Sequence, residues 1–405
     1  MSERKLPISQ FELVSLLAML SATVAFSLDA MLPALPQIGE ALSPDAPNRA
    51  QLVVGSFVLG LGLGTFFTGA LSDAYGRKPV AVFGALIYCA AALVAAFAPS
   101  LETLLVARFV QGLGAAGPRV TAMAIARDLF SGRRMAQVLS YVIFVFTLTP
   151  IFAPTIGYAI ALAFGWRGIF ASFAVFSFIS IAWLLIRLPE TLAPEYVRPF
   201  RPAKLWEGTR AILGNRRVVL ATIVQTLIFG TLFSTLASSQ QVFGEVFNKA
   251  ETFPLWFGLM AILASGSNLI NARIVVRLGM REVVRRVLLI QGGFTLIFAV
   301  LQLTNMIPEP LAFPLTFLWL TSIFYIAGFG IGNMNALALE PLGHMAGLAA
   351  SIITALATIG AGLLSVPIGL AFDGTVLPLT IGAGLLVGAA LLVLTQVEAD
   401  VPAAG

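Results

Sequence analysis

The sequence predicts an all-α integral membrane protein whose twelve transmembrane helices form two pseudo-symmetric six-helix bundles. Of its 405 residues, 59% are hydrophobic and 11% are charged, whereas soluble globular chains carry about a quarter charged residues. The mean hydropathy is +0.95. Apolar runs of about 20 residues, the length that crosses a bilayer, recur along the chain. A short charged sequence also returns half a chain later, which indicates an internal repeat.

Short polar connections separate the apolar runs, and one longer connection divides them into two sets of six. The expected spans are 9–32, 50–72, 80–98, 101–126, 136–163 and 167–187, then 218–243, 253–275, 284–304, 311–338, 345–370 and 375–396. We therefore expect an N-terminal bundle over 1–188, a cytoplasmic linker over 189–216 and a C-terminal bundle over 217–405. Four prolines mark the linker, and 203–213 within it could form a short helix on the membrane surface.

The arginines and lysines indicate the orientation of the spans. With the N-terminus placed in the cytoplasm, 19 of the 24 basic residues fall in cytoplasmic connections, as the positive-inside rule requires. Both termini are then cytoplasmic, and we expect the protein in a bacterial inner membrane. The net charge of +5 follows from this topology, so no nucleic-acid partner is expected. The single cysteine, Cys89, excludes an internal disulfide.

The stretch Gly69–Lys78 is a charged connection between two apolar runs and is the first candidate for a working part. Its charges must lie in water or at the headgroup boundary, and its central glycine permits a tight reversal. Residues 73–78 return as 276–281, 203 positions later, with Val276 in place of the aspartate. Only the first loop therefore offers a carboxylate. The candidate functional residues of this loop are Gly69, Asp73, Gly76, Arg77 and Lys78.

Asp29 is the only acid expected deep within a span, where ionisable groups are costly and are functional by default. Because its surroundings can tune a carboxyl to exchange protons near neutral pH, Asp29 is a candidate proton-coupling residue. Arg108 lies about 12 Å from the outer end of its span, a depth comparable with that of Asp29. The two could form an ion pair that a proton on Asp29 would weaken. The alternative is a permanent pair that only locks two helices together.

Arg119 follows Arg108 by eleven residues, which is within about 20° of three full helical turns. Both arginines then lie on one helix face, about 16 Å apart. If this face lines a cavity, its charge disfavours cations and favours anions or neutral molecules rich in hydrogen-bond acceptors. Alternatively, Arg119 reaches the cytoplasmic boundary and pairs with a backbone carbonyl or with Glu12.

Other polar and aromatic residues within the spans are candidates for a substrate pocket. Besides Asp29, Arg108 and Arg119, the predicted substrate-binding set comprises Gln111, Tyr141, Phe144, Gln225, Phe229 and Asn333. The sequence has no phosphate-binding loop, zinc-ligand spacing, pair of catalytic carboxylates or nucleophile elbow. We therefore expect no metal, no cofactor and no enzymatic activity.

Several of these motifs resemble the major facilitator superfamily. Gly69–Lys78 is similar to its signature loop, with glycine, aspartate, glycine and basic residues at matching positions, and Arg108–Ala116 resembles the fourth-helix motif of its proton-coupled members. Ala153–Tyr158 keeps the proline and one glycine of the antiporter pattern but has alanine and tyrosine elsewhere, which leaves the direction of transport open. The segments that resemble the bicyclomycin and chloramphenicol resistance branch of drug:proton antiporters are Leu28–Pro36, Arg127–Asp128 and Gly165–Arg167.

The resemblance implies a major facilitator fold and a proton-coupled secondary transporter that exports small amphiphilic, phenicol-like drugs by alternating access. It also implies that the Gly69–Lys78 loop latches the two halves in the outward-facing state. On physical grounds, Asp73 could lie against the positive N-terminal end of the eleventh span, near 344–347. The alternatives are a proton-coupled transporter of an organic anion or metabolite and, more remotely, a non-transporting receptor or scaffold. The expected partners are a small-molecule substrate, protons and the lipid bilayer, and we expect a monomer.

Overall fold

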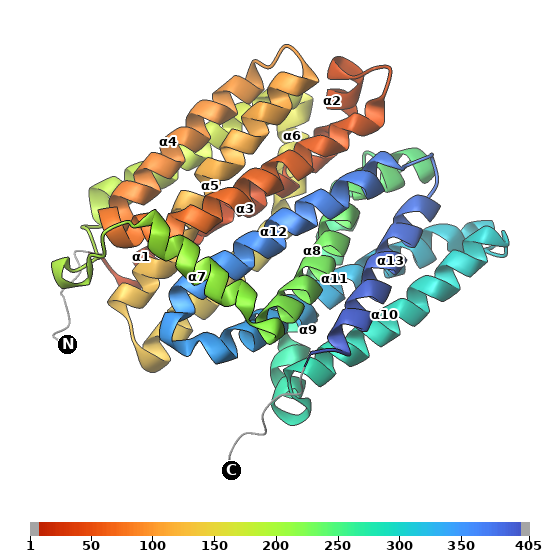
Figure 1. The fold of residues 1–405 in the computed structure, drawn as a ribbon. Helices are drawn as coiled ribbons and strands as arrows, with labels where there is room; N and C mark the ends of the chain where they lie inside the picture. Colours follow the sequence, from red (N-terminus) through yellow and green to blue (C-terminus); the bar gives the residue numbers. More distant parts are fainter. Residues whose placement is uncertain (1–7, 398–405) are drawn as a thin grey trace. The chain divides into compact units, whose positions relative to one another are not determined.

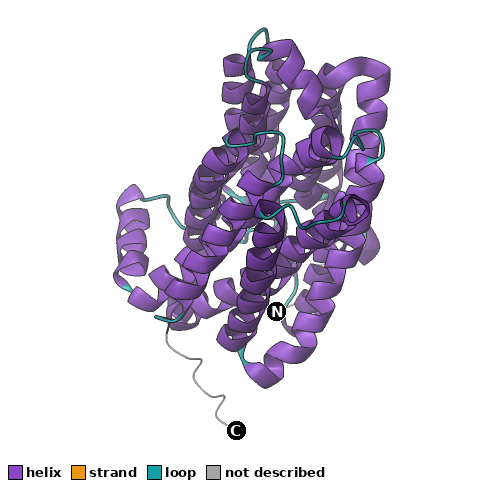
Figure 2. Ribbon diagram, turned by 90° about the vertical axis from the view of Figure 1, so that its right-hand side faces the viewer, coloured by secondary structure: helices purple, strands orange, loops and turns teal. Residues whose placement is uncertain are grey.

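The computed structural model describes residues 8–397, apart from the side chains of Ala136 and His344. Throughout this range the regular structure is helical, as Figure 2 shows. The chain forms two compact units, Met1–Leu205 (unit 1) and Trp206–Gly405 (unit 2). The predicted bundle boundaries at 188 and 217 differ from this division and stay predictions.

Unit 1 contains the first half of the helices, coloured red to yellow-green in Figure 1. They are α1 (Gln10–Asp29), η1 (Leu32–Ala34), α2 (Leu35–Leu42), η2 (Pro47–Gln51), α3 (Leu52–Tyr75), α4 (Arg77–Ala96), α5 (Leu101–Leu129), α6 (Gly132–Arg187) and η3 (Pro194–Tyr196). Gly165, with φ 69° and ψ 178°, interrupts α6 and divides it into two helices. The helix α7 (Pro202–Gly214) begins in unit 1 and ends in unit 2.

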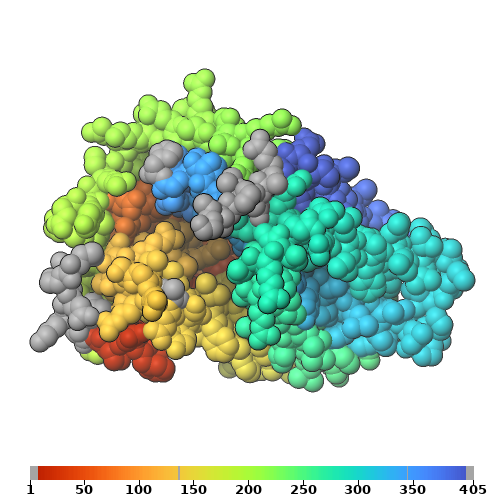
Figure 3. Space-filling view, turned by 90° about the horizontal axis from the view of Figure 1, so that it is seen from below, coloured from red at the N-terminus to blue at the C-terminus, as the bar shows by residue number. Residues whose placement is uncertain are grey.

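Unit 2 contains the second half, coloured green to blue in Figure 1. Its elements are α8 (Arg216–Gln241), the π-helix η4 (Val242–Val246), α9 (Phe253–Leu278), α10 (Met280–Leu303), α11 (Glu309–Leu339), η5 (Glu340–Met345), α12 (Ala346–Leu370) and α13 (Leu377–Leu394). The helix α8 packs against α11, α12 and α13, while α11 also contacts α9 and α10. Figure 3 shows α9, α10 and α11, coloured teal to cyan, beside one another at the surface.

The predicted set of membrane-spanning helices is confirmed. Within residues 8–397, ten helices are long and apolar enough to cross a membrane. One of them is α6, which counts as two spans because of its break at Gly165. The fourth predicted span, α5, is not among the ten, and its interior carries Arg108 and Arg119. With α5 included, the described chain has the twelve spans that the sequence predicts.

The helix α1 ends at Asp29, before the predicted end of the first span at residue 32, although the apolar helical run continues through η1 and α2 to Leu42. Proline at position 33 explains this end: its ring would collide with the carbonyl of Asp29, four residues earlier. The chain continues as the short helices η1 and α2, which have prolines in their first turns. The predicted aspartate therefore lies at a helix end within the protein, where backbone groups lack helical partners.

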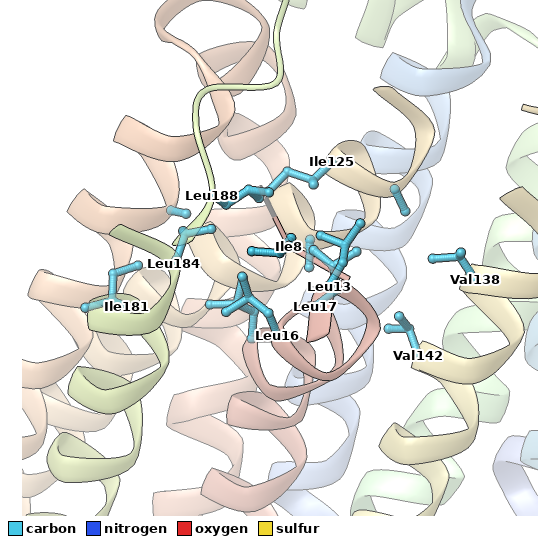
Figure 4. Close-up of a cluster of buried hydrophobic side chains, with 14 of the residues drawn as sticks. Ile8, Leu13, Leu16, Leu17, Ile125, Val138, Val142, Ile181, Leu184 and Leu188 are labelled. Atoms are coloured by element: carbon cyan, nitrogen blue, oxygen red, sulfur yellow. The ribbon is translucent and has the colours of Figure 1, made fainter. Parts of the chain in front are cut away.

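Unit 1 is held together by α5, which packs against α3, α4 and α1, and by the contact of α1 with α6. Gly112 of α5 lies against α3, and a methyl group there would overlap the carbonyl oxygen of Phe57. Small residues of this kind allow membrane helices to approach closely. Towards the start of α1, Leu13, Leu16 and Leu17 form a buried apolar cluster with residues of α5 and α6 (Figure 4).

Candidate functional site

Asp29 is a buried acid at the last position of α1, with only 5% of its surface exposed. Within residues 8–397, no hydrogen bond or ion pair joins its side chain to another residue. The helix end beside it is closed by the backbone N–H of Ala30, which donates to the carbonyl of Phe26 at 3.1 Å. Asp29 is therefore an acid enclosed by protein without a counter-charge in the described structure.

Arg108 is completely buried in α5 and its guanidinium is held by neutral groups. Its Nε donates to the carbonyl of Val53 at 3.4 Å, one terminal nitrogen donates to Gln111 Oε1 at 2.7 Å, and the other donates to the carbonyl of Ser27 at 3.1 Å. The guanidinium carbon lies 4.3 Å from the ring centre of Phe57, a cation–π contact. These contacts fix the cation between α1, α3 and α5.

The predicted ion pair between Asp29 and Arg108 is wrong for the described structure. Arg108 binds the carbonyl of Ser27, which belongs to the last turn of α1, where carbonyls lack partners within the helix. Cations are favoured at this negative end of a helix dipole. The side chain of Asp29 lies two residues further on, about 200° around a helix from that of Ser27. Arg108 thus caps the end of α1 that carries Asp29 and does not neutralise its charge.

A buried polar cluster surrounds this cap and was missed by the sequence analysis. The hydroxyl of Ser27 donates to the carbonyl of Thr23 at 2.6 Å and shares a short hydrogen bond with the hydroxyl of Tyr88 from α4. Gln111 is buried beside Arg108, and its Nε2 has no hydrogen-bond partner. The only sequence signal for Tyr88 was that it places a polar hydroxyl inside the apolar run 80–98.

Arg119 is half-buried in α5, immediately after Pro118. The part of the chain that the structure describes offers it no hydrogen bond and no ion pair. Within the described residues Arg119 therefore pairs neither with Glu12 nor with a backbone carbonyl. Glu12 instead accepts hydrogen bonds from Arg187 at 2.6 Å and Trp183 at 3.2 Å. Arg119 differs from Arg108 in having its donors free.

The two predicted aromatic residues of unit 1 are separate from this cluster. Tyr141 and Phe144 lie on the first half of α6 and are exposed. The hydroxyl of Tyr141 accepts a hydrogen bond of 3.5 Å from Gln137 on the same helix. Within residues 8–397, no hydrogen bond or ring contact joins either side chain to Asp29 or Arg108, so their role in binding stays a prediction.

The Gly69–Lys78 loop is reduced to a single residue between two helices. The helix α3 ends at Tyr75 and α4 begins at Arg77, while Gly76 between them has φ 100°, a value that side chains at Cβ disfavour. Arg77 pairs with Asp73 on one side, and its Nε donates to Asp128 at 2.9 Å on the other. The loop therefore ties α3, α4 and α5 together through one guanidinium.

Glu190 extends this network to the segment after α6, and it was not predicted. Its carboxylate accepts hydrogen bonds from the backbone N–H groups of Arg77 and Lys78, each at 3.0 Å. It thus occupies the positive N-terminal end of α4. The ammonium of Lys78 donates to the carbonyls of Leu185 and Leu188 at 2.9 and 2.8 Å. The network lies wholly within unit 1, and the predicted latch to the eleventh span stays a prediction.

In unit 2 the predicted binding residues are uncharged. Gln225 of α8 is buried, and its Oε1 has no hydrogen-bond partner. Phe229 stacks on Phe233 of the same helix, with ring centres 5.8 Å apart. Asn333 of α11 donates from its amide to Asn271 Oδ1 at 2.9 Å and to the carbonyl of Phe329 at 2.8 Å. Asn271 of α9 was missed by the sequence analysis, and it links two helices of this unit.

The chain matches the family model described as Major Facilitator Superfamily over residues 16–365. It belongs to the major facilitator superfamily. It is therefore a multi-pass membrane transporter and not an enzyme, as the sequence predicts. The matched residues include Asp29 at the end of α1, Arg108 of α5 and the Gly69–Lys78 loop.

The relatives of this transporter are of similar length. It is 28% identical to a bicyclomycin resistance protein homolog of Haemophilus influenzae, with 85% of each chain covered. It is 31% identical to a multidrug resistance protein MdtL of Shewanella oneidensis, with 80% of each chain covered. The solved structure of a D-xylose-proton symporter shares its fold, with a TM-score of 0.76 at 16% identity, covering 96% of this chain and 99% of that chain.

Proposed function

We propose that this transporter is a proton-coupled exporter of small amphiphilic drugs, with both termini in the cytoplasm of a bacterial cell. The observation that carries the proposal is the contrast among its buried charges. Arg108 donates to three neutral acceptors, whereas Asp29 and Arg119 have no partner in the described structure. Ionisable groups within membrane spans are expensive and mark transport sites.

Asp29 is proposed to carry the coupling proton. An ionised carboxylate enclosed by protein and without a counter-charge is costly, so a bound proton stabilises this arrangement. Loss of the proton places a negative charge near the break between α1 and η1, close in the chain to the carbonyl that Arg108 caps. That charge change can bias two conformations against each other. Each charge moved through the membrane field contributes about 2.3 kcal/mol per 100 mV.

Substrate recognition is proposed to use Arg119 in unit 1 and neutral amides in unit 2. The free guanidinium of Arg119 can donate several hydrogen bonds but cannot accept any. Gln225 and Asn333 can both donate and accept. Such a set suits a neutral molecule with several acceptor oxygens and disfavours a cation. The other proposed contacts are Gln111, Tyr141, Phe144 and Phe229, and the chain is proposed to act as a monomer.

The relatives support export as the direction of transport. Proteins named for bicyclomycin resistance and multidrug resistance cover most of this chain. Resistance of this kind is consistent with removing drug from the cytoplasm. The positive-inside distribution of the basic residues supports the proposed orientation of the termini.

Transport into proteoliposomes tests the proposal. Purified protein is reconstituted, a pH gradient is imposed, and movement of neutral, anionic and cationic compounds is followed. We expect gradient-driven movement of neutral, acceptor-rich compounds opposite to the proton flow, and little movement of cations. Movement of anions alone would replace the drug-export proposal with organic-anion transport. Transport that ignores the pH gradient for every compound would overturn proton coupling.

A further inference from the structure

A groove between α4 and α5 lies outside the polar clusters described above. It has a volume of about 640 Å³. Ala91 and Ala107 are buried at its floor, while Val94, Val106 and Val110 are exposed along it. Small residues on two long neighbouring helices leave a hollow here. In a membrane protein, an exposed apolar hollow of this kind is filled by lipid chains.

The groove is polar at one end only. Glu102 and Thr103 line it in the first turn of α5, and the remaining lining residues are apolar. From Glu102 to Val110 the helix rises about 12 Å, at about 1.5 Å per residue. This end of α4 and α5 is opposite the Gly76 reversal. The groove therefore suits an extended ligand with a long apolar part and one polar end.

An ion pair lies at the polar end of the groove. Arg49 of η2 donates to Glu102 Oε1 at 2.9 Å, and both side chains are exposed. The pair presents a positive and a negative charge side by side at the boundary of an apolar groove. A zwitterionic headgroup has the complementary arrangement, since its phosphate can accept from a guanidinium and its ammonium can donate to a carboxylate. An anionic headgroup would instead face repulsion from Glu102.

We propose that this groove is a binding site for one phosphatidylethanolamine molecule. An acyl chain lies over Ala91 and Ala107, the phosphate accepts from Arg49, and the primary ammonium donates to Glu102. The proposal is independent of the substrate and of the proton step. It requires a headgroup that has both a phosphate and a hydrogen-bond-donating ammonium.

Native mass spectrometry of the full chain, with phosphatidylethanolamine, phosphatidylcholine or phosphatidylglycerol added at equal concentration, tests the proposal. Ala90→Leu fills the groove from an exposed position and is expected to lower phosphatidylethanolamine retention, because the leucine side chain takes space that the acyl chain would occupy. The matched control Ala171→Leu alters an exposed alanine of α6 outside the groove and should retain the lipid as the unaltered chain does.

The headgroup contacts are tested with Glu102→Gln and Arg49→Gln. Each should lower phosphatidylethanolamine retention about fivefold, as expected for one exposed charge contact. Glu102→Gln should also remove the preference over phosphatidylglycerol. The proposal is overturned if Ala90→Leu retains as much lipid as Ala171→Leu. Equal retention of all three lipids by the unaltered chain would also overturn it.

Discussion

The two units have related helices, but the polar residues inside their spans differ: unit 1 has charged residues there and unit 2 has neutral amides. In unit 1, Arg108 and Arg119 lie in the interior of α5, and Asp29 lies where α1 ends within the longer apolar run Gln10–Leu42. In unit 2 the charged residues of the described spans lie within two turns of helix ends, and the interior polar groups include the amides of Gln225 and Asn333. A repeated fold therefore does not carry a repeated site. In the proposed function, proton chemistry belongs to unit 1 and neutral recognition to both units.

The two copies of the charged loop, Gly69–Lys78 and its repeat at 276–281, also differ in their charged contacts. Gly76 and Gly279 have nearly the same backbone, with φ of 100° and 80° and ψ of 157° in both. Lys78 donates to carbonyls at the end of α6, and Arg281 donates to carbonyls at the end of α13. The two reversals thus share a geometry and a basic anchor. Only unit 1 adds the guanidinium of Arg77 between two carboxylates.

The largest effect is expected from removing the acid of unit 1. Asp29→Asn keeps the size and polarity of the side chain but cannot bind and release a proton. We expect gradient-driven transport in proteoliposomes to fall to the level of protein-free vesicles, because the proposed coupling step is lost. Substrate binding, measured by fluorescence quenching or calorimetry, should persist as the control for folding. Unchanged acceleration by a pH gradient would remove Asp29 from the mechanism.

The next largest effect is expected from removing the guanidinium of Arg77 in the Gly69–Lys78 loop. Arg77→Met gives the first loop the residue that unit 2 has at position 280. The side chains of Arg77 and Asp128 are only 10% and 20% exposed, so breaking their pair should cost about 3 kcal/mol of unfolding free energy. The measurement is the thermal unfolding of purified protein.

Arg281→Met is the matched control in unit 2. Its guanidinium makes only long contacts to carbonyls, of 3.3 to 3.5 Å, so the expected cost is about 1 kcal/mol or less. Equal destabilisation by the two variants would show that the ion network adds nothing to the reversal itself.

The fold could be predicted from the sequence, because membrane spans are set by the local length of apolar runs. The loop was also evident, since its glycine and charges are adjacent in sequence. Its partners Asp128 and Glu190 were not evident, because Asp128 comes from the end of α5 and Glu190 from the segment after α6. The pairing of Asp29 with Arg108 failed for a related reason. Depth in the membrane can be estimated from a sequence, but a backbone carbonyl such as that of Ser27 leaves no sequence signal.

A smaller effect, on selectivity, is expected from Arg119→Ala. Removing a free guanidinium should weaken transport of acceptor-rich neutral compounds and anions by about tenfold, the size of one hydrogen bond to a charged group. Transport of cationic compounds should rise, because a positive charge is lost. Uptake rates for matched neutral, anionic and cationic compounds measure the change. Arg119→Lys, which keeps the charge, serves as the control. An identical substrate profile in all three proteins would place Arg119 outside the cavity.

The smallest effect is expected in unit 2, from Asn333→Ala. The variant loses the hydrogen bond to Asn271 of α9, and a bond of this kind between membrane helices contributes about 0.6 kcal/mol. It also loses the bond to the carbonyl of Phe329, which lies within α11. We expect KM for a neutral substrate to rise about threefold, with the response to a pH gradient unchanged. Asn268→Ala, one turn earlier than Asn271 and exposed, should leave KM unaltered. A changed pH response in Asn333→Ala would extend proton chemistry into unit 2 and break the division between the units.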